Sequence, residues 1–425
     1  MCSTICNSEC GLNFIANADV DVGVTAESTF SLAGKQIKFN AAEDIKSYAQ
    51  ALIEQTGVRK IDISGNTLGI EALKEFAAAI IAHKETLAEV DFSDIYTGRL
   101  NTEIPQSLDH LLPALLQCRN LKIVNLSDNA FGLQTIDPIE AYLGQAVSVE
   151  HLILSNNGMG PFAGARIGKA LYKLGLAKKQ QKYPSLKTFI CGRNRLENGL
   201  INYLAIGLRA HEHLHTVRLY QNGIRPAGVE KLISQGLARN THLQVLDLQD
   251  NTLTSRAAVA LAESLGQWTR LSELNLNDCL LKPKGSLVLA EKLATGVERP
   301  SFKTLKLQYN ELEADALKRL VSAIEGKLPA LSTLELNGNR FDEECDEISA
   351  ITELLEDRDG ELDELDDLEE LDSDEESDDE EEGEDTFDDF DADLDQLETE
   401  LAGKSAEDAD QGVDAIADEL AGTHL

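Results

Sequence analysis

One short phrase recurs along most of the chain and constrains its fold more than any other feature. It has two apolar residues two positions apart, two or three small or polar residues, and then an asparagine. Its clearest copies, from IDISGN to LELNGN, end at Asn66, Asn129, Asn157, Asn194, Asn222, Asn251, Cys279, Asn310 and Asn339. A degenerate copy ends at Ile95 and a truncated first copy ends near Lys35. From Lys35 onward the intervals are 31, 29, 34, 28, 37, 28, 29, 28, 31 and 29 residues, so one structural unit is repeated about eleven times.

The chemistry of this phrase is that of a leucine-rich repeat. Apolar residues two apart, such as Leu246 and Leu248, place both side chains on one face of a short strand, and Asp247 points to the other face. The asparagine side chain can bridge backbone groups of successive turns as the chain leaves the strand. Cysteine is the usual alternative at this position, which accounts for the copy that ends at Cys279.

Between the phrases, apolar residues recur at helical spacing and predict one helix in each repeat. The clearest sets are Leu73, Phe76, Ala77 and Ile80; Ile167, Ala170, Leu171 and Leu174; and Val259, Leu261 and Leu265. A period of 28 to 31 residues leaves room for a full helix. We therefore expect an α/β leucine-rich-repeat horseshoe with one parallel sheet on its concave side and helices on its convex side. The two longest intervals predict insertions in loops at residues 95–112 and 175–184.

The repeats and the composition together predict three segments. Residues 1–28 are expected to be a disordered leader, and residues 29–355 the repeat domain. Because terminal repeats otherwise expose their core face, we expect end caps at about residues 29–57 and 341–355. Residues 356–425 are too poor in apolar side chains to fold alone and are expected to form an acidic, mostly disordered tail.

Charge is distributed unevenly between these segments. The chain carries 38 Lys+Arg against 75 Asp+Glu, a formal net charge of −37, but residues 356–400 alone contribute −27. The last 25 residues contribute −5 and residues 1–355 also carry only −5. An acidic chain argues against nucleic acid as a ligand, since phosphate binding requires clustered basic residues. No apolar run approaches the roughly 20 residues of a spanning helix, so a protein partner is expected rather than a membrane.

The cysteines and histidines do not form a convincing metal site. Seven mostly isolated cysteines and a start without secretory-signal features indicate a reducing cytosol. Cys2, Cys6 and Cys10 are spaced by four but lack a fourth ligand. His211, His213 and His215 alternate with other residues in HEHLH. We interpret this alternation as a surface pattern at a repeat junction rather than as a metal site.

Motifs of nucleotide binding and hydrolysis are also missing. The chain contains no GxxxxGK[ST], GxSxG or HExxH sequence. Gly158, Gly160 and Gly164 depart from GxGxxG by one residue, and turn geometry explains them. We therefore expect no cofactor and no enzymatic activity of its own.

The acidic tail contains two further patterns. Leu362, Leu365, Leu368 and Leu371 are spaced by three, which is typical of a nuclear-export signal but would also suit an extension of the C-terminal cap. Ser373 and Ser377 lie among acidic residues, a context that acidophilic kinases favour.

Several strings extend well beyond the repeat phrase. They include SGNTLGIEA at residues 64–72, FSDIYTGRL at 92–100, LSNNGMGPFAG at 154–164 and ICGRNRLENG at 190–199, together with a tail that begins GELDELDDLEELD. Together these strings resemble the Ran GTPase-activating proteins of fungi. The resemblance extends from about Phe30 into the tail. It implies a regulator that accelerates GTP hydrolysis by the nuclear-transport GTPase Ran, which itself holds GTP and Mg²⁺. It further implies a cytoplasmic monomer, excluded or exported from the nucleus, with Ran-GTP and a Ran-binding protein as partners.

The resemblance also implies which residues act. Asn156 would help to orient the GTPase's own catalytic Gln, without an arginine finger. Arg99, in the degenerate YTGRL loop, would then contribute to binding or to loop packing, and Asp250 would pair with a basic residue of Ran. The complete set of expected contacts beside Asn156 is Arg99, Asp128, Arg193, Arg195, Gln221 and Asp250.

A second hypothesis is a non-catalytic, acidic leucine-rich-repeat protein that binds histones or phosphatases through its tail. Proteins of that class have shorter repeats, so the period of 28 to 31 residues favours the GTPase activator.

Overall fold

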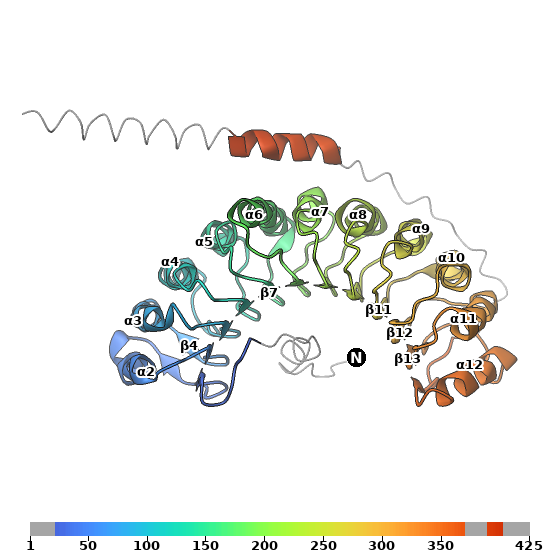
Figure 1. Ribbon diagram of the computed structural model, residues 1–425, viewed down its shortest axis with the longest axis horizontal. Coiled ribbons are helices and arrows are strands. Elements are labelled where there is room, and N and C mark those ends of the chain that lie inside the picture. Colours follow the sequence, from blue (N-terminus) through green and yellow to red (C-terminus); the bar gives the residue numbers. More distant parts are fainter. Residues whose placement is uncertain (1–21, 370–388, 403–425) are drawn as a thin grey trace, which may run out of the picture. The chain divides into compact units, whose positions relative to one another are not determined.

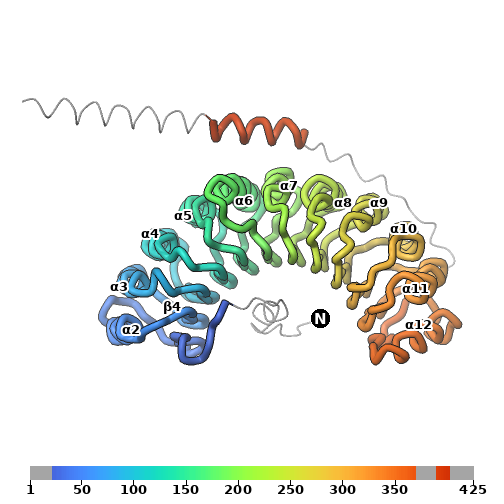
Figure 2. Tube along the Cα trace, viewed as in Figure 1, coloured from blue at the N-terminus to red at the C-terminus, as the bar shows by residue number. Residues whose placement is uncertain are grey.

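The repeats form a curved solenoid in the computed structural model, which describes residues 22–369 and 389–402. The first range belongs to one compact unit, and the second belongs to a separate unit at residues 377–425, where residues 390–402 are helical. In the first unit, strands line the inside of the curve and helices lie outside (Figure 1). The Cα trace shows one strand–loop–helix turn following another (Figure 2). The α/β horseshoe predicted from the repeats is therefore confirmed.

The inner layer is a single parallel sheet whose spatial order follows the order of the chain. This order is expected of a solenoid, because each repeat contacts only its neighbours. Its twelve strands are Thr29–Ser31 (β1), Lys60–Asp62 (β3), Glu89–Asp91 (β5), Ile123–Asn125 (β6), His151–Ile153 (β7), Thr188–Ile190 (β8), Thr216–Arg218 (β9), Val245–Asp247 (β10), Glu273–Asn275 (β11), Thr304–Lys306 (β12), Thr333–Glu335 (β13) and Glu361–Leu362 (β14). A second, two-stranded sheet pairs Lys38–Phe39 (β2) with Thr67–Leu68 (β4).

The outer layer consists of one helix in each repeat. The α-helices are Ala42–Glu54 (α2), Ile70–Ile80 (α3), Glu103–Leu116 (α4), Ile136–Leu143 (α5), Gly160–Gln181 (α6), Ile201–Arg209 (α7), Pro226–Lys231 (α8), Thr254–Leu265 (α9), Lys282–Thr295 (α10), Ala314–Gly326 (α11) and Asp346–Glu356 (α12). Short helical turns cover Ile81–His83 (η1), Leu133–Thr135 (η2) and Leu232–Leu237 (η3). Within the two described ranges, no helix is both long and apolar enough to span a bilayer.

The core lies between the two layers and is built from the residues that define the repeat. Leu246 and Leu248 are buried, as are Leu261 and Leu265 on α9. Val259 was also predicted to face the core but is 43% exposed. The reason is geometric: at 100° per residue, position 259 lies on the opposite side of α9 from Leu261.

The ladder asparagines join consecutive repeats, as predicted. Asn157 donates through Nδ2 to the carbonyls of Leu126 (3.1 Å) and Leu154 (2.9 Å). Its Oδ1 accepts from the backbone N–H of Asn129, the preceding ladder residue, at 2.8 Å. Cys279 substitutes for asparagine by donating its thiol to the carbonyl of Leu248. Each ladder side chain therefore satisfies backbone groups that would otherwise be buried without partners.

The longest insertion lies in a helix and not in a loop, so this prediction was wrong. Residues 175–181 extend α6, which ends in a left-handed residue at Lys182. Lys178 fixes this extension by donating from Nζ to the carbonyls of Val147, Val149 and Pro184, at 2.6 to 2.8 Å. Burial lowers the pKa of Lys178 to about 8. The other insertion is partly helical as well, because α4 already includes residues 103–112.

The repeat domain also ends later than predicted, since residues 361–369 fold onto its C-terminal end. We call this segment the acidic strap. Asp363 accepts hydrogen bonds from the backbone of Leu336 (2.7 Å) and Asn337 (3.0 Å) and from Gln308 Nε2 (2.7 Å). These backbone groups lie at the end of β13, where β14 adds the last strand. The proposed boundary at residue 356 therefore cuts through the cap.

The leucine pattern at residues 362–371 is partly absorbed by this cap. Leu362 pairs with Leu334 in the sheet, and Leu362, Leu365 and Leu368 are half-buried. The cap interpretation therefore accounts for these three leucines, and recognition as an export signal stays a prediction. Leu371, Ser373 and Ser377 lie outside the described residues, as does most of the leader, including its cysteines.

We predict that Asn222→Ala lowers the free energy of unfolding by about 3 kcal/mol. The change removes two hydrogen bonds to the carbonyls of Cys191 and Leu219, and leaves the N–H of Asn194 without its partner. Gln221→Ala is a matched control at the adjacent exposed position and should change stability by less than about 0.5 kcal/mol. Equilibrium urea denaturation measures both, and equal effects would contradict a structural role for the ladder.

Truncation should distinguish the acidic strap from the rest of the tail. A chain that ends at residue 369 keeps Asp363 and its three donors, and should unfold at the same urea concentration as the full chain. A chain that ends at residue 355 loses those bonds and the two that Arg358 donates to Ile324 and Leu328. We expect it to lose about 3 kcal/mol in urea denaturation. Indistinguishable midpoints for the two truncations would show that the strap does not stabilise the cap.

Candidate partner-binding rim

The residues that immediately precede the ladder positions form a row, which we call the rim. All ten have positive φ, between 49° and 69°: Gly65, Asp94, Asp128, Asn156, Arg193, Gln221, Asp250, Asp278, Tyr309 and Gly338. Because the repeats stack in register, equivalent residues lie along one edge of the sheet, just beyond the ends of the strands. The left-handed backbone gives every repeat the same tight turn and presents one side chain per repeat at this edge.

Residue type along the rim is restricted by this conformation. Glycine, asparagine and aspartate tolerate positive φ well, and seven of the ten positions carry them. Arg193, Gln221 and Tyr309 do not belong to this group, and each costs roughly 1 kcal/mol relative to a residue that favours the left-handed region. Other residues of the repeats, such as Ala130, Glu197 and Leu280, also have positive φ, so the turns of this chain accept side chains of several types.

Asn156 is exposed, but its amide is oriented by the neighbouring repeat. Its Nδ2 donates to Asp128 Oδ1 at 2.7 Å. Burial raises the pKa of the Asp128 carboxyl, and the hydrogen bond from Asn156 opposes that shift. An ionised carboxylate can only accept, so the amide nitrogen must face Asp128 and the amide oxygen is directed away from it. Two of the residues expected to act together are therefore in direct contact.

Tyr220 supports the turn beside Asn156 and was not predicted. Its phenol donates to Ser155 Oγ at 3.2 Å, although the two residues belong to repeats on either side of Gly192. A Cβ on Gly192 would come within 2.4 Å of the Tyr220 ring, so only glycine fits beneath it. The signal in the sequence was the glycine in ICGRN, at a position where the two neighbouring repeats carry Ser155 and Tyr220.

The other expected contact residues are available to a partner. Arg193, Arg195, Gln221 and Asp250 are all exposed. Arg195 follows its ladder residue and also has positive φ, 53°. The structure brings Arg193 near Asp128, whose pKa it helps to lower by its charge. Arg193 and Arg195 come from one turn, and Gln221 and Asp250 come from the next two turns of the same edge.

Arg99 is placed differently and packs against the N-terminal cap. Its Nη2 donates to the carbonyls of Phe39 (2.9 Å) and Thr67 (3.1 Å), and its Nε to Thr67 Oγ1 (2.9 Å). The guanidinium is half-buried. Arg99 was expected to contribute to partner binding or to loop packing, and these hydrogen bonds favour loop packing.

The acidic strap covers the C-terminal end of the rim. Tyr309 donates its phenol to Asp367 at 3.1 Å, and Arg340 Nε donates to Glu369 at 2.9 Å. Asn337 donates from Nδ2 to Asp366 at 2.8 Å. The side chain of Tyr309 is therefore bound by the strap. The strap does not cover the part of the rim from Asp94 to Asp278, which we call the open rim.

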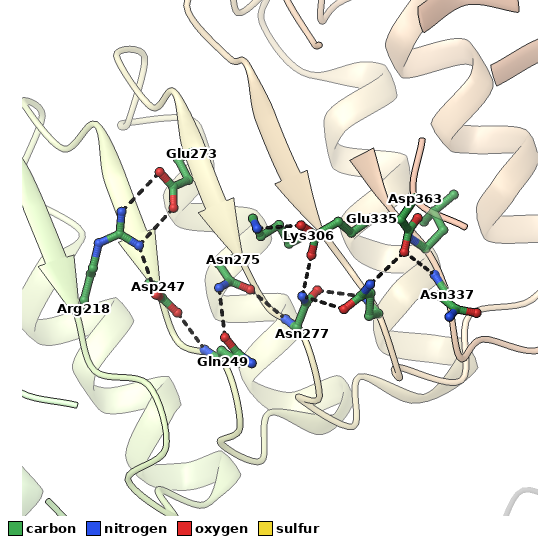
Figure 3. A network of polar contacts seen from close by, with 12 residues as sticks. Arg218, Asp247, Gln249, Glu273, Asn275, Asn277, Lys306, Glu335, Asn337 and Asp363 are labelled. Atoms are coloured by element: carbon green, nitrogen blue, oxygen red, sulfur yellow. Dashed lines mark hydrogen bonds and ion pairs between the residues drawn. The ribbon is translucent and has the colours of Figure 1, made fainter. Parts of the chain in front are cut away.

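Charges on the adjoining inner face are largely paired (Figure 3). Arg218 bridges Asp247 and Glu273, with N···O distances of 3.0 Å to each. Lys306 pairs with Glu335. Asp247 points to the concave side as predicted, and burial raises the pKa of its carboxyl against the opposing effect of Arg218. Ionic groups available to a partner are therefore found on the open rim more than on this part of the sheet.

Histidine and cysteine do not build a metal site in the described part of the chain, where no group of three or more potential ligands is found. His211 is fully buried, with Nε2 2.9 Å from the carbonyl of Leu171, so it is not the surface residue that we expected. Burial lowers the pKa of His211 to about 3, and the imidazole is neutral. His213 instead packs edge-on against His242.

Known proteins resemble the chain at two levels. A family model described as "Leucine Rich repeat" matches residues 239–262. The Ran GTPase-activating protein 1 of Saccharomyces cerevisiae is 48% identical over 337 residues, which cover 78% of this chain and 83% of the yeast protein. The Ran GTPase-activating protein of Drosophila melanogaster is 38% identical over 76% of this chain, which spans 54% of that protein. A solved internalin from Listeria monocytogenes covers 73% of this chain and 68% of its own, at 13% identity and a TM-score of 0.44.

The fold and the rim define a leucine-rich-repeat protein with an exposed polar edge. Such a class is broad, but the yeast relative matches at high identity over most of both chains, well beyond the repeat consensus. The chain belongs to the Ran GTPase-activating protein family.

Proposed function

We propose that the protein stimulates GTP hydrolysis by Ran, and that it binds this GTPase through the open rim. Membership of the family supports the activity. The exposed Asn156 amide, oriented by Asp128, is the observation that supports the site. The protein is then a regulator and not an enzyme: the nucleotide, the Mg²⁺ and the reacting atoms all belong to the partner.

Asn156 acts by positioning the partner's catalytic glutamine. Because Nδ2 is engaged with Asp128, Oδ1 is left to accept a hydrogen bond from the amide nitrogen of that glutamine. The glutamine oxygen then faces the attacking water and accepts a hydrogen bond from it. Fixing one rotatable side chain in this way lowers the entropic part of the barrier without any charge from the activator.

Arg99 is a poor candidate for an inserted arginine. To reach a nucleotide it would have to give up three hydrogen bonds to Phe39 and Thr67, which join the loop to the cap. This geometry supports a mechanism without an arginine finger from that loop. Arg193 is exposed on the open rim. A test of the mechanism must therefore ask whether Arg193, rather than Asn156, is needed for catalysis.

Affinity comes from the remaining positions of the open rim. Acidic residues stand at both ends, Asp94 and Asp128 on one side and Asp250 and Asp278 on the other, with Arg193 and Arg195 between them. A partner with the opposite alternation would be held in one register, since like charges in any shifted register would repel. The family resemblance assigns Asp250 to a basic residue of Ran, which this alternation supports, and Gln221 is assigned to a polar contact.

Further aspects of the proposal follow from the family. Ran is bound in its GTP form, and a Ran-binding protein is a further partner. The activator works as a monomer in the cytoplasm and holds no cofactor of its own. The competing hypothesis is a non-catalytic module that binds histones or phosphatases through the acidic tail.

A single-turnover assay separates these hypotheses. We predict that micromolar protein accelerates phosphate release from GTP-loaded Ran by at least about 10³-fold over the intrinsic rate. A chain truncated after residue 369 should retain this effect, because it keeps the whole open rim. Phosphate release that does not change with added protein would leave only the binding module.

Two rim substitutions should affect different parameters. Asn156→Ala should reduce the maximal single-turnover rate about 100-fold with little change in the half-saturating concentration, since it removes a contact to the reacting side chain. Asp250→Ala should raise the half-saturating concentration about tenfold and leave the maximal rate unchanged. Arg193→Ala serves as the comparison. A loss of maximal rate with Arg193→Ala that exceeds the loss with Asn156→Ala would assign catalysis to an arginine instead.

A further inference from the structure

A cavity opens between two consecutive repeats at the edge of the sheet opposite the rim. It has a volume of about 310 Å³ and lies between the loop that leads from α7 to β9 and the loop that leads from η3 to β10. Rim residues follow their strands and these loops precede theirs, so in a parallel sheet the two features lie at opposite ends of the strands. The lining of the cavity includes Arg209, Glu212, His213, Arg239, Thr241 and His242.

The charged side chains of the cavity are mainly basic, although residues 1–355 carry a net negative charge. Arg209 and Arg239 are accompanied by one carboxylate, that of Glu212. Two positive charges and one negative charge leave the cavity at +1 while its imidazoles are neutral. Protonation of His213 and His242 would raise this charge to +3.

His215 shows that the potential around the cavity is positive. Its ring centroid lies 6.2 Å from that of His242. Burial lowers the pKa of His215, and the positive charges of Lys187, Arg270 and the two neighbouring imidazoles lower it further. An anion bound beside these groups would relieve their repulsion.

Basic side chains elsewhere along this edge have partners within the chain. Lys122 and Lys187 both pair with Glu150, at 3.2 and 2.6 Å. Arg299 donates to two backbone carbonyls. The side chain of Arg239, by contrast, is exposed and forms no ion pair or hydrogen bond within residues 22–369 and 389–402. Arg239 is therefore a cation that a ligand can bind.

The two histidines of the cavity are not held by hydrogen bonds either. His151 and His211 each bond through a ring nitrogen to a neighbouring residue. In the part of the chain that the structure describes, the rings of His213 and His242 make no such bond, and the buried Nδ1 of His242 has no partner. The two rings pack edge-on, with centroids 4.8 Å apart. A bound anion would accept hydrogen bonds from both rings in their protonated form.

A buried amide holds the two loops together. In the orientation that satisfies its surroundings, Asn240 donates from Nδ2 to the carbonyls of His211 (2.8 Å) and Glu212 (3.3 Å). Asn240 is buried and adjoins Arg239, and Glu212 adjoins His213. The bridge therefore fixes the backbone on both sides of the cavity, so that its donors are ordered before a ligand arrives.

We propose that this cavity binds a phosphate group, either as the free ion or on a phosphorylated side chain of a partner protein. The planar guanidinium groups of Arg209 and Arg239 present paired N–H donors that match phosphate oxygens. The hydroxyl of Thr241 and the imidazoles of His213 and His242 supply further donors. A phosphate group has three acceptor oxygens and up to two negative charges, so it uses this set of donors more fully than a carboxylate does. Because the cavity lies opposite the rim, its ligand leaves the open rim free.

Calorimetric titration of the full-length protein tests the site with two probes, inorganic phosphate and a short peptide that carries one phosphoserine. Arg239→Gln should weaken the binding of phosphate at least about tenfold. Arg319→Gln is the matched control, because it removes an exposed arginine from α11, and it should leave the affinity within about twofold. Equal affinities of the two variants, or no binding of either probe, would overturn the proposal.

The peptide arm identifies the source of the phosphate group. If the phosphopeptide binds as tightly as phosphate and is also weakened by Arg239→Gln, the source is a phosphorylated partner. Binding of phosphate alone assigns the site to the free ion. An unphosphorylated peptide that binds as tightly as the phosphorylated one would contradict recognition of phosphate.

The pH dependence of sulfate binding provides an independent measurement, since sulfate stays a dianion at neutral and mildly acidic pH. Imidazoles gain positive charge as the pH falls from about 8 to about 6, so the affinity should rise at least about fivefold. The double variant His213→Gln/His242→Gln should lose this rise, with circular dichroism to check that the repeats stay folded. The other charged or titratable groups around the two rings are the same in both proteins: Arg209, Glu212, His215, Arg239, Lys187 and Arg270. An equal rise in the double variant, or none in the unaltered protein, would contradict a role for these imidazoles.

Stimulation of Ran should not depend on this cavity. Arg239→Gln should leave the single-turnover rate of GTP hydrolysis unchanged, because Arg239 lies away from the open rim. The binding measurements contain no GTPase, so they succeed or fail independently of the proposed function. A loss of stimulation in this variant would overturn the separation of the two sites.

Discussion

The hydrogen bonds of the ladder asparagines are the interaction on which the rest of the structure depends. Every turn that leaves the sheet buries backbone groups that cannot pair within their own repeat. Asn194 shows how this is solved: its Nδ2 donates to the carbonyl of Leu154 in the preceding repeat, and its backbone N–H donates to Asn222 Oδ1 in the following one. Since every repeat depends on its neighbour in the same way, the stack keeps one register along its length.

The same constraint produces the candidate site. Because the ladder fixes the turn, the residue before each ladder position takes positive φ and its side chain is displayed at a fixed spacing. The scaffold thus pays the conformational entropy of ordering the rim during folding rather than at binding. In the proposed function, the ordered amide of Asn156 positions a reacting group of the partner, a task for which a mobile loop would be less suited.

How much of this arrangement can be predicted from the sequence depends on how local its causes are. The ladder, the strands and the rim positions follow from a six-residue phrase, and Cys279 was assigned correctly because a thiol can donate in place of an amide. The leucine spacing allowed an extension of the C-terminal cap, but the structural role of the acidic residues could not be recognised, because Asp363 is ordered by donors on Gln308 and Leu336, from two other repeats. The extension of α6 was missed for a similar reason. From the sequence alone Lys178 would be predicted to lie on the surface, because the three carbonyls to which it donates lie in other parts of the chain. Arg99, too, could be identified in the sequence but not assigned to the cap.

The acidic strap also changes the interpretation of the net charge. Its carboxylates at Asp363, Asp366, Asp367 and Glu369 accept hydrogen bonds from the last repeats, so part of the acid has a structural role. The remaining charge of the tail is screened over about 8 Å at physiological ionic strength, and it can attract a basic partner only at short range. Orientation must therefore come from the few charges at fixed positions on the open rim. There, an arginine pair between two pairs of aspartates specifies a register, which a diffuse excess of negative charge cannot do.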